Sequence, residues 1–453
     1  MVYYGRGRYL KIKKKLSIRE KELKVKFLGG LKIAITNIKA FNFKSFKEID
    51  VDLRKFNIFI GSNASGKSNF VQIFKFLKDI HEHDLRNAIS IQGGVEFLRN
   101  SKLNKSKNLF IELTLDTKLR AKLEEDKGLR VHKTIYGFEL EFINEKPGFN
   151  VVNDYLVYNV SFHEIDLEKD ELGEQIGTAE FKFLNRNGEI DLEFINEPAN
   201  LKKNSTIKKF IDSLEEQNES LSEQTKPNTI LLESPFIFLP FPILIDFLKN
   251  ISIYDVDPKH AKKAMAITGK ADLEEDGSNL AIVLQDILED KDKKRKLINL
   301  MTNLLPFIID VGVESFVDTS LIVKVKESYS KNTELPASLM SDGSINVLVL
   351  IIALYFESGE ITIFEEPERN IHPYLISKII DMFEEISDKK QIIVTTHNPE
   401  FIKNAKLENI LFISRNEEDY SHISRICDKE EIKIFLKNEI GIEELYVDNL
   451  LGD

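Results

Sequence analysis

The chain has 453 residues, 42% of them hydrophobic and 30% charged, which predicts two or three folded domains and excludes a disordered or fibrous protein. One cysteine, Cys427, excludes an intramolecular disulfide, and no secretory signal or uninterrupted stretch of about 18 apolar residues appears, so we expect a cytoplasmic protein with no membrane span. The formal charge of −11 weakens any attraction of the whole surface to nucleic acid.

Basic residues are concentrated at the start of the chain. Residues 1–30 hold 10 of the 63 Lys and Arg but only 2 of the 74 Asp and Glu, which leaves 53 basic and 72 acidic side chains for the rest. Such an extension suits a nucleic-acid-binding arm. A solvated extension or a misplaced start codon explains it equally, because strand-like patterning begins only at Leu31.

Residues 31–107 read as strands followed by a helix. Alternating or apolar runs at 31–38, 49–53 and 56–60 predict three strands, and the last of them stops at Gly61. Apolar residues at helical spacing then predict a helix over residues 69–80. The result is a unit of strand, loop and helix.

The pattern changes over residues 108–270. Short alternating runs such as 110–115 and 138–142, with turn residues at Asn187-Gly188, predict an antiparallel sheet. Residues 201–226 are polar and predict a helical or mobile insertion. Helices over 280–288 and 293–305 follow, and after residue 335 apolar strands alternate with helices, as in an α/β fold.

The strongest motif lies between the strand 56–60 and the helix that follows it. It matches G-x-x-x-x-G-K-[ST] over Gly61, Ser62, Asn63, Ala64, Ser65, Gly66, Lys67 and Ser68. Both glycines allow backbone amides to approach phosphates, Lys67 reaches the outer phosphates, and the Ser68 hydroxyl can ligate magnesium. The motif predicts a nucleotide site with ATP and Mg²⁺ as cofactors.

Hydrolysis also needs acids at the end of a neighbouring strand. The apolar run 361–364 predicts a strand buried on both faces, and Glu365 and Glu366 follow it. We expect Glu365 to hold the magnesium shell and Glu366 to polarise the attacking water. Paired acids after a strand are also common solvated loop residues, but the phosphate loop favours the catalytic interpretation.

Two further segments complete the candidate site. The strand 391–396 ends at His397, which we expect at the level of the γ-phosphate, although a lone histidine at a strand end is commonly structural. Ser341 precedes the apolar helix 345–356, where it suits a simple helix cap or a helix start that binds phosphate.

The order of these motifs resembles ABC-type ATPase heads of the SMC, RecF and OLD kind. It runs from the phosphate loop (Walker A) through Ser341-Asp-Gly343 and the strand ending in Glu-Glu-Pro-Glu (Walker B) to Thr-Thr-His397. The hairpin at 38–46, residues 275–284, Asn370-Ile-His-Pro373 and residues 441–445 add to the similarity, which covers most of residues 31–453. The resemblance implies an α/β fold, a P-loop head with an antiparallel β and helical insertion.

The resemblance also assigns roles by motif. Gln92 in Ser-Ile-Gln-Gly-Gly corresponds to the glutamine that contacts magnesium and water, and Lys44 and Ser45 lie where an early loop approaches nucleotide. Asn69 belongs with the nucleotide-binding segment, and Asn370–His372 with a loop that faces the partner subunit. In such dimers two heads sandwich two nucleotides, so Ser341 and Gly343 would contact the nucleotide on the partner's phosphate loop.

Three features depart from the pattern. Asp342 stands where transport ATPases have glycine, which fits the RecF-like group better, and Glu365 replaces the more common Walker B aspartate. Only 56 residues follow His397, too few for the Toprim nuclease of OLD proteins, so we expect a stand-alone head. The predicted division is a basic extension (1–30), two parts of the head (31–107 and 271–453) and an insertion (108–270).

The resulting hypothesis is a Mg-dependent ATPase that dimerises on ATP and acts in DNA repair or antiphage defence. Its expected partners are a second copy of the chain, an effector protein such as a nuclease acting in trans, and DNA. The alternative is a non-hydrolysing, ATP-gated scaffold or clamp that recruits a partner. A transporter subunit fits poorly, because a long insertion separates the phosphate loop from Ser341.

Overall fold

A computed structural model describes the chain at residues 25–28, 33–123, 126–143, 148–166, 169, 171–196, 201–222, 226, 228–233, 243–266, 270, 272–316, 320–330, 333–428 and 442–447. These residues form two compact units, one built from residues 1–42 and 80–246 and the other from 43–79 and 247–453. The predicted boundaries at 107/108 and 270/271 mark changes of sequence character, and each lies inside one unit. Most of the basic extension predicted at 1–30 lies outside the described residues.

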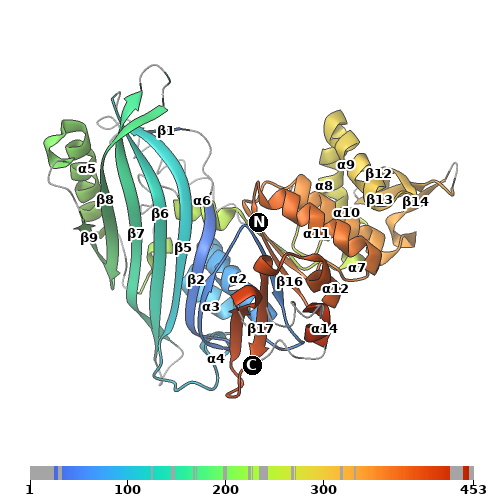
Figure 1. Cartoon of the computed structure of the whole chain (residues 1–453), viewed down its shortest axis with the longest axis horizontal. Coiled ribbons are helices and arrows are strands. Elements are labelled where there is room, and N and C mark those ends of the chain that lie inside the picture. Colours follow the sequence, from blue (N-terminus) through green and yellow to red (C-terminus); the bar gives the residue numbers. More distant parts are fainter. Residues whose placement is uncertain are drawn as a thin grey trace. The chain divides into compact units, whose positions relative to one another are not determined.

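An antiparallel sheet dominates the first unit. Its strands are β1 (Val25–Phe27), β2 (Ile33–Phe43), β5 (Leu109–Leu123), β6 (Lys127–Phe142), β7 (Phe149–Asp166), β8 (Glu171–Arg186) and β9 (Glu189–Ile195). The order is β2-β5-β6-β7-β8-β9, with β1 also paired to β5, and Figure 1 shows β5 to β8 as long strands side by side. The predicted antiparallel sheet is confirmed, but β5 to β8 have 15 to 18 residues and not the short lengths expected.

The helices of the first unit are α3 (Leu85–Ile91), α4 (Val95–Leu98) and α5 (Ser205–Ser222), with 3-10 turns at Leu201–Lys203 and Leu231–Glu233. Helix α5 realises the helical segment predicted within 201–226. The ring of Phe210 on α5 lies 6.0 Å from Phe162 and 6.2 Å from Phe181, centroid to centroid. One face of the sheet is therefore covered by an amphipathic helix, as apolar alternation along the strands requires.

The second unit contains the sheet that carries the phosphate loop. Its order is β10 (Ile251–Tyr254), β15 (Ile361–Glu365), β16 (Gln391–Thr396), β4 (Phe56–Ile60), β17 (Ile410–Arg415) and β18 (Ser421–Arg425). All neighbouring pairs are parallel except β17 and β18. Every residue of β4, β15 and β16 is buried, which explains their continuous apolar runs and confirms the predicted α/β class.

The described residues of the second unit also form helices. They are α2 (Lys67–His83), which begins in this unit, α6 (Ile243–Lys249), which ends in it, α7 (Pro258–Ala261), α8 (Leu280–Glu289), α9 (Lys291–Leu304), α10 (Asp342–Tyr355), α11 (Pro373–Ser387), α12 (Pro399–Asn404) and α14 (Ile442–Val447). Strand β3 (Phe46–Asp52) packs beside β18. A second small sheet has the order β11 (Met265–Ala266), β13 (Ser320–Glu327) and β12 (Ile308–Phe316), with β14 (Glu334–Pro336) on β13. No helix of the described segments has the length and apolarity needed to cross a bilayer.

Candidate functional site

The phosphate loop follows β4 and leads directly into α2. A Cβ atom on Gly61 would lie 2.2 Å from the carbonyl oxygen of Ile413, so only glycine fits there. Gly66 has a φ of +120° and Ala64 a φ of +63°. These backbone angles turn the loop from strand to helix within six residues, which is why the motif needs its glycines.

Lys67 folds back over this loop. Its Nζ atom donates to the carbonyl oxygens of Gly61 at 2.8 Å and Ser62 at 3.0 Å. Burial lowers the pKa of Lys67, and the charges of Glu366 and Glu368 partly oppose that shift. The side chains of Ser62, Asn63, Ala64 and Ser68 are exposed. The loop is therefore accessible to solvent, while the ammonium group of Lys67 is buried against the loop carbonyls.

Two distant residues hold the loop in place. The guanidinium of Arg415, at the end of β17, donates from Nε and Nη2 to the carbonyl of Ala64 at 3.1 and 3.0 Å. The Ser421 hydroxyl, on β18, donates to the carbonyl of Ser65 at 2.5 Å. Neither residue was predicted from the sequence, because nothing in their local pattern indicates a contact some 350 positions away.

The early loop at Lys44 and Ser45 joins this network. The hydroxyl of Ser45 accepts from Nδ2 of Asn69 at 2.7 Å and lies 2.8 Å from the hydroxyl of Ser421. Lys44 has a φ of +47°, and burial lowers its pKa. Ser45 and Asn69 therefore belong to the hydrogen-bond network beside the phosphate loop. Lys44 is half-buried, and its contact with nucleotide stays a prediction.

The acidic strand end lies at the same edge of the sheet. Glu365 pairs with Thr395 in register, and Thr396 pairs with Ile60, so the carboxyl ends of β15, β16 and β4 meet. The loop residues Gly61, Glu366 and His397 follow these three strand ends. The parallel register therefore brings together residues from three distant segments.

Glu366 is held by two basic side chains. Its Oε1 lies 2.8 Å from Nδ1 of His397, and its Oε2 accepts from Nε of Arg369 at 3.0 Å. Burial alone would raise the pKa of Glu366, but the bonds from Arg369 and His397 outweigh it and leave the pKa below its usual value. Arg369 also binds Asp255 at 2.6 Å. Sequence analysis missed Arg369 and Asp255.

Glu365 is 8% exposed and forms an ion pair with Lys75 of α2, Nζ to Oε1 3.2 Å. Lys75 also binds Glu275. Burial lowers the pKa of Lys75, but the two carboxylates outweigh this effect and raise it. Lys75, two turns beyond the phosphate loop, thus neutralises the carboxylate that we expect to bind magnesium. In the sequence, this pairing is indicated only by the helical spacing that places Lys75 on the same side of α2 as Lys67.

Glu368, two residues after Glu366, is buried and accepts a hydrogen bond from the hydroxyl of Thr396. Burial raises its pKa to about 7. Because the carboxyl group of Glu368 is mostly protonated below this pH, it can lie close to Glu366 without strong repulsion.

The segment around Ser341 is a helix start with a charged clamp. Ser341 caps α10, and its Oγ accepts from the amide of Ser344 at 3.1 Å. A Cβ atom on Gly343 would lie 2.3 Å from the carbonyl oxygen of Asn370, so glycine permits the helix start to approach that loop. Lys262 binds the carboxylate of Asp342 and donates to the carbonyl of Met340 at 2.7 Å.

Gln92 belongs to the first compact unit. It is 9% exposed and caps the C-terminus of α3, where its backbone N–H donates to the carbonyl of Ala88. Its contact with magnesium stays a prediction.

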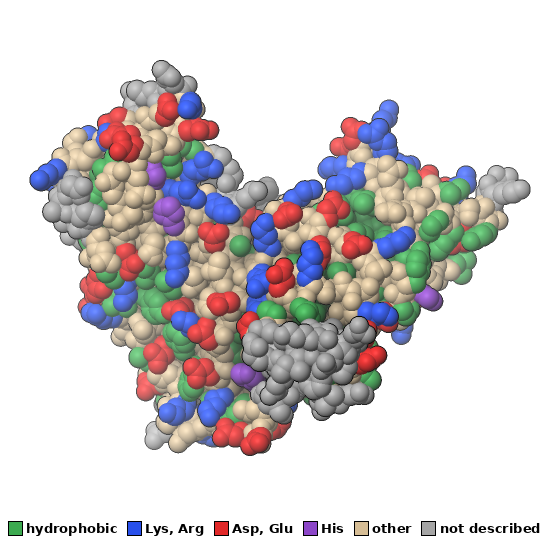
Figure 2. All heavy atoms as spheres, viewed as in Figure 1, with side chains coloured by type: hydrophobic (Ala, Val, Ile, Leu, Met, Phe, Trp, Pro, Cys, Tyr) green, Lys and Arg blue, Asp and Glu red, His purple; other side chains and the backbone are tan. Residues whose placement is uncertain are grey.

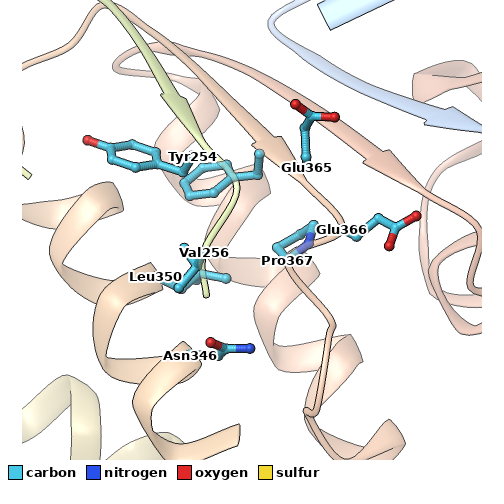
Figure 3. A pocket seen from close by; sticks show the side chains of 8 residues that line it. Tyr254, Val256, Asn346, Leu350, Glu365, Glu366 and Pro367 are labelled. Carbon is cyan, nitrogen blue, oxygen red and sulfur yellow. The ribbon is translucent and has the colours of Figure 1, made fainter. Parts of the chain in front are cut away.

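A small pocket borders the loop that carries Glu366. Figure 3 shows Glu366 and Pro367 along one side, with Tyr254 and Leu350 opposite and Asn346 below. Nδ2 of Asn346 donates to the carbonyl of Arg369 at 2.5 Å. Glu366 also has a φ of +47°. The loop therefore combines an unusual backbone angle with a small pocket beside it.

Comparison with known proteins assigns a family. The family model described as "AAA domain, putative AbiEii toxin, Type IV TA system" (AAA_21) matches residues 56–403. No curated protein matches the chain in sequence.

The solved structures to which this chain is similar include SMC head domains. The Smc head with an extended coiled coil, bound to the C-terminal domain of ScpA and derived from Pyrococcus furiosus, is 13% identical with a TM-score of 0.43, covering 90% of this chain and 100% of that one. The Smc head with a coiled coil and joint from Pyrococcus yayanosii is 12% identical with a TM-score of 0.41, covering 90% and 100%. The SMC head domain from Thermotoga maritima is 12% identical with a TM-score of 0.36, covering 86% and 98%.

Proposed function

The chain belongs to the AAA_21 family of ABC- and SMC-like P-loop ATPases, and from that premise we propose that it binds ATP with Mg²⁺, hydrolyses it and dimerises when ATP is bound. The observation that carries the proposal is the meeting of the phosphate loop, Glu366 and His397 at one edge of a parallel sheet. Ligands of such sheets bind beyond the carboxyl ends of the strands.

The residues at this edge fit a nucleotide triphosphate. The loop at 62–64 is exposed, and α2 begins with no acidic residue in its first turn. Among the described residues, Lys67 donates to loop carbonyls. Phosphate oxygens can replace those carbonyls as acceptors, and the positive end of the helix dipole favours them. The charge of buried Lys67 would then be neutralised by a phosphate.

The residues also fit magnesium. The hydroxyl of Ser68 is exposed in the first turn of α2, and Glu365 offers a carboxylate at the end of β15. Gln92 is a third proposed ligand. Oxygen ligands of this kind suit Mg²⁺, which when bound neutralises charge on the β- and γ-phosphates.

Each protein group has a part in the proposed chemistry. Glu366 orients the attacking water and accepts its proton, which requires an ionised carboxylate, and its lowered pKa keeps it ionised near neutral pH. His397 is bonded to Glu366 through Nδ1, and we propose that its Nε2 atom contacts the γ-phosphate. Lys67 stabilises the charge of the outer phosphates.

Dimerisation is proposed from the surface around α10. Leu339 lies two residues before Ser341 and is 70% exposed. Tyr374 lies two residues after His372 and is 58% exposed. Exposed large apolar residues beside a polar helix start favour a protein interface. A second copy would place Ser341 and Gly343 against the nucleotide of its partner.

We also propose that the ATPase serves antiphage defence or DNA repair, with an effector in trans and DNA as partners. The family description names a toxin of a toxin–antitoxin system, which favours defence.

The alternative, an ATP-gated scaffold with negligible hydrolysis, has one observation in its favour. Both carboxylate oxygens of Glu366 are bonded to basic groups, which lowers its strength as a base.

Steady-state phosphate release with and without DNA separates the two functions, and calorimetry with Lys67→Ala tests nucleotide binding. We expect measurable turnover from the native chain and no ATP binding by the variant. Thermal melting must show that the variant folds, since Lys67 also bonds the loop. Retained ATP binding would refute the assignment of the phosphate loop.

A further inference from the structure

One end of the long sheet in the first unit exposes rows of basic side chains. Along β5, residues 118, 120 and 122 point to solvent, while 119, 121 and 123 are buried. Arg130 on β6 is likewise exposed between buried neighbours. The basic residues on this face are Lys26, Lys118, Arg120, Lys122, Arg130, His132, Lys133 and His163, and we call them the basic face.

Strand register places like charges opposite one another. Arg120 on β5 pairs directly with Arg130 on β6, and Lys26 on β1 pairs with Lys122 on β5. Cross-strand pairs of like charge destabilise a sheet. Arg120 and Arg130 make no ion pair with any residue that the structure describes, so the fold itself offers this arginine pair no compensation.

Two histidines extend the basic face across β6 and β7. Nε2 of His132 lies 2.6 Å from the hydroxyl of Ser161, and Nε2 of His163 lies 2.8 Å from the same oxygen. Nδ1 of His163 is 3.0 Å from the carbonyl oxygen of Gly173. Burial lowers the pKa of His132, the charges of Arg130 and His163 lower it further, and the charge of Asp116 opposes this shift. Figure 2 shows basic and histidine side chains together on the visible face of this sheet.

The nearby acids are at the margin or already engaged. Asp116 lies 3.8 Å from Lys118, one row beyond the arginines. Asp126 and Glu164 both bind Lys127, at 2.7 and 2.8 Å. The rows that hold Lys26, Lys122, Arg120 and Arg130 contain no acidic residue in their paired positions on β1, β5, β6 and β7.

We propose that the basic face binds the phosphodiester backbone of double-stranded nucleic acid. Charge complementarity selects this partner: two uncompensated arginines, flanking lysines and two histidines face solvent together, while Phe162 on the opposite face packs on α5. The four strands that carry the basic face, β1, β5, β6 and β7, span about 14 Å, which slightly exceeds the width of the major groove of about 12 Å and places basic groups near phosphates on both sides.

The net charge of the whole insertion does not reveal this local cluster of basic residues. The predicted insertion at 108–270 is acidic as a whole, and the most basic stretch of the sequence is residues 1–30. Strand β1 joins the two observations, because it places Lys26, near the end of that basic segment, beside Lys122.

Binding is measured by fluorescence anisotropy of a labelled 30-base-pair duplex with the full chain and no nucleotide, between 50 and 200 mM salt. The native chain should bind with a strong salt dependence. Arg120→Glu/Arg130→Glu should weaken binding at least ten-fold at low salt and make the log–log salt slope shallower by about 2, because each phosphate contact contributes about 0.9.

Arg86→Glu/Arg186→Glu is the matched control. It makes the same change of charge on exposed arginines of the same unit, away from the basic face, and should bind like the native chain. Circular dichroism and melting confirm that each variant folds, and Arg120→Gln/Arg130→Gln provides a milder substitution that should also weaken binding.

Three results would overturn the proposal: no duplex binding by the native chain at 50 mM salt, an equal loss in the control variant, or tighter binding of polyglutamate than of duplex, which would indicate an acidic protein partner. The proposal does not depend on ATPase activity. Lys67→Ala should bind duplex normally even though we expect it to lose ATP, so the two proposals fail separately.

Discussion

Nδ1 of His397 lies 2.8 Å from Oε1 of Glu366, although the two residues are on loops after different strands. The contact exists because β15 and β16 are parallel neighbours that end at the same edge of the sheet. Arg369 binds the other carboxylate oxygen of Glu366, so two basic groups set the charge state and direction of the candidate base. The chemistry of the site can therefore be tested through this triad.

Glu366→Gln should separate binding from hydrolysis. The substitution keeps the volume of the side chain and removes the base, so ATP should still bind while hydrolysis falls about 10²-fold or more. Phosphate release and calorimetry measure the two effects, and Glu417→Gln, on an exposed loop, is the control. A rate within a few-fold of the native rate would show that another residue activates water.

The same variant should accumulate an ATP-bound dimer. ATP that is not hydrolysed keeps two heads together if the nucleotide lies between them. Light scattering with ATP and Mg²⁺ measures this, and a particle that stays monomeric would contradict the sandwich.

Arg369→Gln should change the pH dependence of hydrolysis. Arg369 helps to hold the pKa of Glu366 below its usual value, so its removal raises that pKa and moves the acidic limb of the kcat profile to higher pH. Arg295→Gln, which alters an exposed surface ion pair, should leave the profile unchanged. An unshifted limb in Arg369→Gln would mean that Glu366 does not titrate in the rate.

Lys262→Ala should weaken dimerisation without loss of ATP binding. Lys262 neutralises Asp342 and holds the carbonyl of Met340, next to the helix start that we expect to meet the partner's nucleotide. We expect the ATP-dependent dimer to weaken about ten-fold, or roughly 1.4 kcal/mol, for loss of a charge-assisted clamp. Lys263→Ala, its exposed neighbour, should dimerise normally, and equal weakening in both variants would remove the role of Lys262.

Asp154→Asn should flatten the pH dependence of stability. Asp154 is fully buried, and burial raises its pKa to about 7, well above the value of an unfolded chain. The folded state therefore binds the extra proton, so the contribution of Asp154 to stability is present below pH 4 and is lost as pH rises toward 7. The amide cannot ionise, and its oxygen can still accept from the amide of Leu231. Urea unfolding from pH 4 to 8 measures the effect, and an unchanged slope would show that Asp154 does not titrate on folding.

Local sequence was enough to predict the phosphate loop and the strands that flank it. The loop, Lys67 and α2 are contiguous, and a fully buried parallel strand must be apolar on both faces, so β15 and β16 were predicted with nearly the observed bounds. The long strands of the first unit were underestimated. Their solvent face is polar and β-bulges interrupt the alternation, for example between Asp116 and Leu119, which divides each strand into short apparent runs.

Only the tertiary structure decided which side chains meet. Arg415 binds Ala64, Lys75 binds Glu365 and Lys262 binds Asp342 across long separations in the chain, and no local pattern encodes such contacts. The basic face depends on register in the same way. If β6 were shifted by one residue along β5, Arg120 would pair with an apolar neighbour of Arg130. Arg130 itself would then point to the opposite face of the sheet. Composition and local periodicity determine which segments form strands and helices, whereas strand pairing determines which charges lie side by side.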